Sequence, residues 1–382
     1  MNIPVINAVV NSKNLSLMTL PRFAPNAAQM KPGNLCRAAP ATETAMAAIT
    51  ACRPAVAAQA VPAATAHLVD IKYMRSHLVI ATRGSKLALW QAEYVKSLLQ
   101  GVDPSVNVSI NVIKTKGDII KNRPLAKIGG KGLFVKEIED ALLDGRADLA
   151  VHSVKDMPME LPEGLILGCV PQRQAVTDSY VSYKYPAFQL LPQNARVGTS
   201  SLRRQAQLLA KRPDLRIESL RGNVDTRLKK IENGDFDATI LATAGMNRLG
   251  LDAPFVQPLD ADDFLPAAGQ GALGIECHED NYDLFVLLAH LENRDARLCV
   301  DAERSFVRAL NGNCQAPVAA RGRLIDEEML ELEGLVAEPD GSMVLRAKHI
   351  APAEDATQLG ILVADEIKNN GGDAIIERLI NS

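Results

Sequence analysis

Four short motifs of this sequence place Arg or Lys, together with hydroxyl side chains, directly after a predicted strand. They are TRGS (residues 82–85), HSVKD (152–156), GTSSLRR (198–204) and LRGNVDTR (220–227). Arginine has a planar fork that binds carboxylate or phosphate through two hydrogen bonds, and backbone N–H groups at helix N-termini also bind anions. The motifs together predict a site for an anionic ligand. Taken singly, each motif is better explained as an ordinary helix cap with solvated arginines.

The candidate anion-binding residues are the basic and hydroxyl residues of these motifs. They are Arg83, Ser85, Ser153, Lys155, Thr199, Ser201, Arg203, Arg204, Arg221 and Arg227.

Asp156 is an acid among these bases. It is a candidate for catalysis; the alternative is a salt bridge or a cap before Met157. His152 is better explained as a packed residue at a strand end than as a base. The six histidines show no paired ligand spacing, so a metal site is not expected.

Cys314 lies in NGNCQAP (311–317), among residues that favour turns. A cysteine that serves as a small core residue usually lies within an apolar run. The six cysteines include no CxxC pair, which excludes the common zinc and redox patterns and fits a reducing compartment. A thiol in a turn is expected to be exposed, so Cys314 is a candidate for chemistry.

GGKGLF (129–134) is similar to a phosphate-binding loop but lacks the GxxxxGK[ST] spacing, so a nucleotide site is not expected. Residues 121–132 are predicted to form either a mobile lid with a Gly-Gly hinge or a plain surface loop.

The composition limits the classes of partner. The chain has 382 residues, a net charge of −3 and 4% aromatic residues. Neither stacking on single-stranded nucleic acid nor non-specific DNA binding fits these values. No stretch is long and apolar enough to span a bilayer.

Apolar strands alternate with amphipathic helices from residue 77 onward, which predicts α/β domains with mainly parallel sheets. The carboxyl ends of such strands gather ligands, so the four motifs are expected to meet there. A helix over 294–312 and a hairpin over 337–350 predict a small α+β unit at the C-terminus. The apolar residues of segment 1–74 recur with neither a helix nor a strand period. This segment is expected to be a transit peptide or an upstream tail.

These motifs together resemble the porphobilinogen deaminase (hydroxymethylbilane synthase) family. The resemblance runs from residue 77 to the C-terminus. It rests on ATRGSKLALWQAE, PLAKIGGKGLFVKEIEDALL, DLAVHSVKDMP, VGTSSLRRQAQL, LRGNVDTRL, LPAAGQGALGIE and NGNCQAPVAA.

The resemblance implies a fold with two periplasmic-binding-protein-like domains, of mixed and mainly parallel sheets, and a small α+β domain. It implies domain 1 over 75–172 and 272–290, domain 2 over 173–271 and domain 3 over 291–382. It also implies a dipyrromethane cofactor, two linked pyrroles, attached through a thioether to Cys314.

The resemblance also divides the site residues by role. It implies that Asp156 is catalytic. The cofactor-binding set would be Cys314, Lys155, Asp156, Ser153, Thr199, Ser201, Arg203 and Arg204. The substrate-binding set would be Arg83, Ser85, Arg221, Arg227 and Gln270.

The implied activity is a transferase of porphyrin, heme and tetrapyrrole biosynthesis, with chlorophyll biosynthesis as an option. It would deaminate four porphobilinogen molecules and join them head to tail into hydroxymethylbilane. The alternative is a non-catalytic module that binds a carboxylated small molecule. The expected form is a monomer without nucleic-acid or membrane partners, located in the cytoplasm, or in the plastid stroma if residues 1–74 are a transit peptide.

Overall fold

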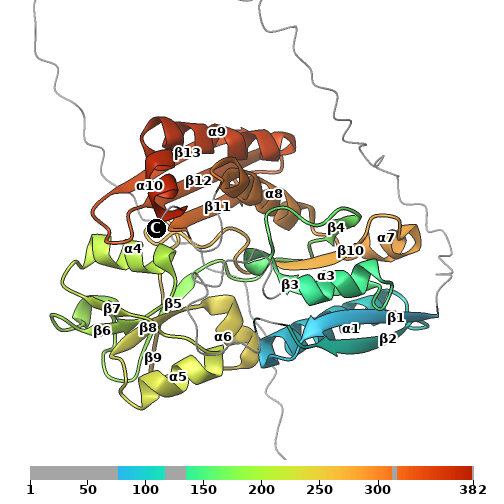
Figure 1. Cartoon of the computed structure of the whole chain (residues 1–382), viewed down its shortest axis with the longest axis horizontal. Coiled ribbons are helices and arrows are strands. Elements are labelled where there is room, and N and C mark those ends of the chain that lie inside the picture. The colour runs from blue at the N-terminus through green and yellow to red at the C-terminus, as the bar shows by residue number, and fades with distance from the viewer. Residues whose placement is uncertain (1–75, 116, 118–134, 312–315, 381–382) are drawn as a thin grey trace, which may run out of the picture. The chain divides into compact units, whose positions relative to one another are not determined.

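The computed structural model describes residues 76–115, 117, 135–311 and 316–380. Three predictions lie outside these residues: the N-terminal tail, the lid over 121–132 and the placement of Cys314. By its contacts the chain divides into two units, 1–67 and 68–382, and everything below concerns the second unit (Figure 1).

The first sheet has five strands in the order β2-β1-β3-β10-β4, and β10 runs antiparallel to both of its neighbours. Helices α1 and α7 pack on one face and α3 packs on the other. The elements are β1 (His77–Arg83), α1 (Lys86–Val102), β2 (Asn107–Ile113), α3 (Lys136–Leu143), β3 (Leu149–Ser153), β4 (Leu165–Cys169), β10 (Leu273–His278) and α7 (Tyr282–Leu288).

The second sheet repeats this plan in the order β7-β6-β8-β5-β9, with β5 as the antiparallel strand. Its core forms between the sheet, α4 and the short η3 turn on one side, and between the sheet, α5 and α6 on the other. The elements are β5 (Asp178–Ser182), η3 (Phe188–Leu190), β6 (Arg196–Gly198), α4 (Leu202–Lys211), β7 (Arg216–Glu218), α5 (Val224–Glu232), β8 (Ala238–Ala242), α6 (Thr243–Leu249) and β9 (Phe255–Pro258).

The third sheet is an antiparallel meander of β11, β12 and β13, packed against α8, α9 and α10 (Figure 1). The predicted hairpin is confirmed, and Gly341 in its turn has a φ of +74°, which glycine adopts without strain. The elements are α8 (Arg294–Ala309), β11 (Val318–Leu324), β12 (Met329–Ala337), β13 (Val344–Pro352), η4 (Ala353–Asp355), α9 (Ala356–Asn369) and α10 (Gly372–Ile380).

Two segments cross between the first two sheets: residues 170–177 join β4 to β5, and residues 259–272 join β9 to β10. Four of the five strands in each sheet run in one direction, because the antiparallel strand is enclosed by two strands of that direction. The predicted α/β class, with two mixed and mainly parallel sheets and a small α+β unit, is confirmed.

Candidate functional site

Two of the predicted hydroxyl residues begin helices. The Ser85 hydroxyl accepts a hydrogen bond from the Ala88 N–H at the start of α1, and the Ser201 hydroxyl accepts one from the Arg204 N–H at the start of α4. Both have the extended backbone expected of an N-cap. The helices therefore start where the motifs place them, directly after β1 and after β6, and their N-termini are positive ends.

Strand β3 leads into a short 3-10 turn, η2 (Val154–Asp156), which carries two of the candidate residues. Lys155 is partly buried and Asp156 is exposed. Burial lowers the pKa of Lys155 to about 8, although the carboxylate of Asp156 opposes this shift. Ser153, directly before the turn, accepts a hydrogen bond from Gln91 Nε2 at 2.8 Å. Helix α1 thereby fixes the strand end that precedes the turn.

Gln270 connects this turn to the second sheet. Lys155 Nζ donates to Gln270 Oε1 at 3.4 Å, and Gln270 Nε2 donates to Asp178 Oδ1 at 3.1 Å and to the Val176 carbonyl at 2.7 Å. Gln270 is fully buried, so these bonds fix its amide between the two crossing segments.

The glycine before Gln270 allows this close approach. Gly269 has a φ of +73°, and a Cβ there would lie 2.4 Å from Val154 Cγ1 and 3.1 Å from the Lys155 nitrogen. Any side chain would push the crossing segment away from the turn, so glycine is needed here for both its backbone conformation and its size.

Arg203 and Arg204 do not project freely into solvent. Arg204 donates to Asp178 Oδ1 from Nε at 3.2 Å and from Nη2 at 2.7 Å, and Arg203 Nη2 lies 2.8 Å from Asp178 Oδ2. Arg203 also donates to the Leu265 carbonyl at 2.7 Å. Their guanidinium groups are therefore held rigidly at the start of α4, with one carboxylate shared between them.

Asp178 is the residue that the sequence interpretation missed. It is fully buried at the start of β5. Burial acts to raise the pKa of its carboxyl, but Arg203 and Arg204 outweigh this effect and hold the pKa well below its usual range. A single aspartate at the start of a strand has no local signal in the sequence, because its two partners come from a later helix.

We expect Asp178→Asn to lower the free energy of unfolding by about 3–5 kcal/mol, because it leaves two buried guanidinium groups without their counter-ion. Denaturant titration at neutral pH measures this change. Asp214→Asn is the matched control, since Asp214 pairs with Arg212 near the surface, and it should have only a small effect. Equal effects in the two variants would contradict the role given to Asp178.

The remaining arginines complete a cluster of positive charge. Burial, reinforced by Arg204, lowers the pKa of Arg227 to about 10, while Asp156 acts in the opposite direction. Arg227 comes from α5 of the second sheet, and its Nε donates to the Gly222 carbonyl at 2.8 Å. Arg221 also lies within electrostatic range of Arg227. The structure therefore brings Lys155, Arg203, Arg204, Arg221 and Arg227 around Asp156 and Asp178.

Arg83 ends β1 and Thr199 follows β6. Thr199 is buried, and its hydroxyl accepts a hydrogen bond from the Ser201 N–H at 3.2 Å. A further arginine that the sequence did not single out, Arg248 of α6, donates to Gln174 and to the Gly271 carbonyl and lies over the Trp90 ring.

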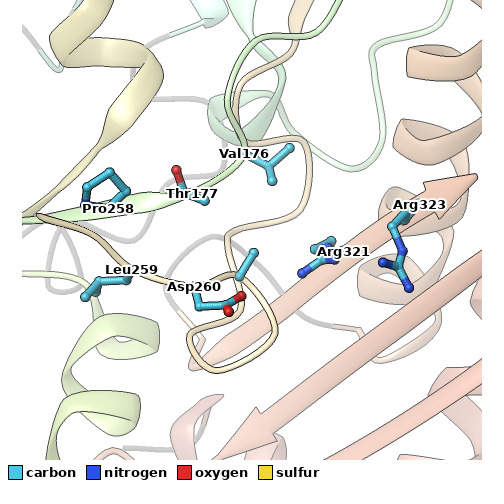
Figure 2. A pocket seen from close by; sticks show the side chains of 9 residues that line it. Val176, Thr177, Pro258, Leu259, Asp260, Arg321 and Arg323 are labelled. Carbon is cyan, nitrogen blue, oxygen red and sulfur yellow. The ribbon is translucent and has the colours of Figure 1, made fainter. Parts of the chain in front are cut away.

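An open hollow of about 590 Å³ lies between the crossing segments and β11 (Figure 2). Val176, Thr177, Asp260, Arg321 and Arg323 are among the residues that line it. Both arginines already form ion pairs, Arg321 with Asp262 and Arg323 with Glu331. These ion pairs compensate the charges of both arginines, as Asp178 does for Arg203 and Arg204.

The charge cluster suits a ligand with several carboxylates, because cations outnumber acids among its described members. No group of His, Cys, Asp and Glu in the described part of the chain is arranged to hold a metal ion. Among the same residues, no helix is both long and apolar enough to cross a membrane.

Comparison with known protein families identifies the family to which this chain belongs. Residues 78–285 match the model "Porphobilinogen deaminase, dipyromethane cofactor binding domain", and residues 297–369 match "Porphobilinogen deaminase, C-terminal domain". The chain belongs to the porphobilinogen deaminase family.

Individual relatives agree with the family assignment. The chain is 55% identical over 307 residues to porphobilinogen deaminase of Nitratidesulfovibrio vulgaris (strain DP4), covering 80% of this chain and 98% of the relative. It is 53% identical over 302 residues to the same enzyme of Maridesulfovibrio salexigens, with 79% of this chain and 98% of the relative covered.

A solved structure of a putative methionine-binding lipoprotein from Bacillus subtilis is 14% identical, with a TM-score of 0.36 over 58% of this chain and 92% of that chain.

The resemblance of the sequence to this family is thus confirmed. The chain is a transferase of porphyrin and heme biosynthesis that polymerises porphobilinogen with a dipyrromethane cofactor. The alternative, a binding module without chemistry, is not favoured.

The described residues fit this cofactor. Each pyrrole of the cofactor and of the substrate carries an acetate and a propionate, and the cluster offers buried guanidinium and ammonium groups to pair with them. Burial of Lys155, Arg203 and Arg227 removes competing water, which strengthens such pairing.

Proposed function

We propose that the cluster around Asp156 is the active site, and that Asp156 is the catalytic residue. The observation that carries this proposal is that an exposed acid on the first sheet lies within electrostatic range of Arg227 on the second. An acid surrounded by anion-binding groups weakens the binding of a carboxylated substrate, which is a cost unless the acid acts in the chemistry.

The role of Asp156 follows from the charge that develops on the substrate. As porphobilinogen loses ammonia, positive charge builds up on its pyrrole nitrogen. A carboxylate that accepts the pyrrole N–H stabilises this charge, and the same group can receive and return a proton as ammonia leaves and the new ring regains its aromatic state.

The cofactor, when bound, supplies the terminal pyrrole carbon to which the first substrate is joined. We propose that Cys314 is its point of attachment. Lys155, Ser153, Thr199, Ser201, Arg203 and Arg204 would hold its carboxylates, and Arg83, Ser85, Arg221, Arg227 and Gln270 would serve the incoming substrate. We further propose three domains with the limits given above.

A monomeric protein in the cytoplasm is the proposed form, with the plastid stroma as the alternative compartment. Its relatives come from bacteria. N-terminal sequencing of the native protein decides between the compartments, because a cleaved tail would place the enzyme in an organelle.

We expect Arg227→Leu to reduce kcat/KM for porphobilinogen by an amount equivalent to about 2–5 kcal/mol, because it leaves a substrate carboxylate unpaired in a desolvated site. Arg227 is a cleaner choice than Arg204, which also supports the fold through Asp178. Steady-state kinetics on protein with confirmed cofactor mass provide the measurement.

Arg216→Leu is the matched control for this experiment. Arg216 is an exposed arginine at the start of β7 in the same sheet, and its replacement should leave the kinetics unchanged. If Arg227→Leu retained wild-type kcat/KM, the arginines would be solvated caps rather than a substrate cradle.

A further inference from the structure

A cluster of charged side chains lies within the protein, close to the turn that carries Asp156. Its members come from α3, β3, β10 and α8, and each is more than nine-tenths buried. They are Glu139, His152, Glu276 and Arg304. In the part of the chain that the structure describes, Glu139 Oε1, Glu276 Oε1 and Arg304 Nη1 form no hydrogen bond. Buried polar groups without a hydrogen bond are rare in proteins, so these three atoms require an explanation.

The register of β3 and β10 brings two of these residues together. His152 lies opposite Gly274, and Glu276 lies opposite Ala150, so the two long side chains are diagonal neighbours on one face of the sheet. The small residues opposite them leave space for contact, and His152 Nε2 lies 2.9 Å from Glu276 Oε2. His152 lies in β3, two residues before the start of the turn.

Helix α8 faces this region with a stripe of residues four apart. Ala296 and Val300 pack with Val154 and Met157, on either side of Asp156 in the sequence. One turn further along α8, Arg304 Nη2 donates to the Pro158 carbonyl at 2.7 Å and to the Met159 carbonyl at 3.1 Å. The guanidinium group thus holds two consecutive carbonyls directly after the turn.

The electrostatics show that Arg304 occupies an unfavourable place for a cation. Burial lowers its pKa to about 10, with Arg308 and Arg297 of the same helix acting in the same direction, while Asp301 and Glu276 oppose the shift. A buried arginine that serves packing alone could be replaced by an apolar residue at little cost. The two hydrogen bonds that Arg304 donates therefore point to a role in fixing local geometry.

Helix α8 also leads toward the proposed cofactor anchor, because it ends at Ala309, five residues before Cys314 in the sequence. We propose that Arg304 is a positioning residue: by fastening Pro158 and Met159 to α8, it sets the carboxylate of Asp156 relative to that helix. This inference rests on the role proposed above for Asp156.

The test compares Arg304→Met, Arg304→Lys and a matched control, Arg297→Met. Arg297 is on the same helix and forms an ion pair with Glu292 at 2.6 Å, but it has no described contact with residues 154–159. Each variant is prepared with its cofactor. We measure the intact mass, kcat and KM for porphobilinogen, and the denaturation midpoint.

Arg304→Met should keep the cofactor mass and a KM within about 2-fold of wild type, but lose about 10–100-fold in kcat, since a small misplacement of a catalytic group has effects of this size. Arg304→Lys retains a donor and a charge, so it should recover part of kcat. Arg297→Met should lower the denaturation midpoint and leave kcat unchanged.

Two results would overturn the proposal. One is a kcat for Arg304→Met equal to that of Arg297→Met, which would make Arg304 a structural residue only. The other is loss of the cofactor mass in Arg304→Met, which would place its role in cofactor loading. If Arg304→Met does not fold, Arg304→Lys provides the test, because this substitution weakens the hydrogen bonds to the Pro158 and Met159 carbonyls. A reduced kcat in Arg304→Lys supports the proposal, and an unaltered kcat overturns it.

Asp156→Asn in the same assay separates this inference from the proposed function. If Asp156→Asn is impaired and the Arg304 variants are not, the active site stands and the positioning role fails. If Asp156→Asn is fully active, the proposed site itself is wrong.

Discussion

Cys314→Ala is expected to give a folded protein that carries no dipyrromethane and forms no product. A thioether to the cofactor needs a thiolate as its nucleophile, and alanine has none. Intact mass spectrometry should show the polypeptide alone, and the porphobilinogen assay should show complete loss of turnover, with an unchanged circular dichroism spectrum.

The three cysteines that the structure describes do not offer a substitute. Cys169, Cys277 and Cys299 are all buried. Burial raises the pKa of the Cys277 thiol to about 12 and that of the Cys299 thiol to about 11, so neither is a thiolate at neutral pH. Cys299→Ala is thus the matched control and should keep the cofactor. Two pyrrole units on Cys314→Ala would show that another residue is the anchor.

Asp156→Asn should reduce turnover by a factor of roughly 10²–10³, the usual effect of removing one electrostatic stabiliser of a transition state. The amide keeps the size and can still accept a hydrogen bond, but it loses the negative charge that offsets the charge developing on the pyrrole. Single-turnover rates and intact masses provide the measurement. Asp156→Glu keeps the charge but moves it, so it should retain some activity and accumulate enzyme–substrate intermediates.

Glu160→Gln is the control for this experiment. Glu160 is an exposed acid four residues further along the chain, so it tests whether loss of any nearby negative charge has the same effect. Its turnover should equal that of wild type. Turnover of Asp156→Asn at the wild-type rate, with full cofactor loading, would remove Asp156 from the mechanism.

Much of the site was predictable because its signals are local. The hydroxyl of Ser85 or Ser201 directly before an amphipathic stretch is a helix start, and the structure has helices at both positions. Alternation of strands and helices placed the motifs at strand ends, where the sheets now bring Lys155 and Arg227 into one region. Periodicity and capping chemistry were sufficient for these features.

The interactions that were not predicted depend on long-range pairing. The sequence suggested that the guanidinium groups of Arg203 and Arg204 would bind a ligand, but both contact Asp178, the first residue of β5. The contact of His152 with Glu276 depends on the register between β3 and a strand from much later in the chain. Nothing near these residues in the sequence specifies such partners.

The position of β10 has a consequence for the order in which the protein can form on the ribosome. Strand β10 lies between β3 and β4, inside the first sheet rather than at its edge. All strands of the second sheet have been synthesised once Pro258 is added. The first sheet begins at His77. Its strand β4, however, pairs only with β10, so β4 has no partner in the sheet until residues 273–278 have been synthesised. Of the two five-stranded sheets, the one whose synthesis begins first is therefore completed second.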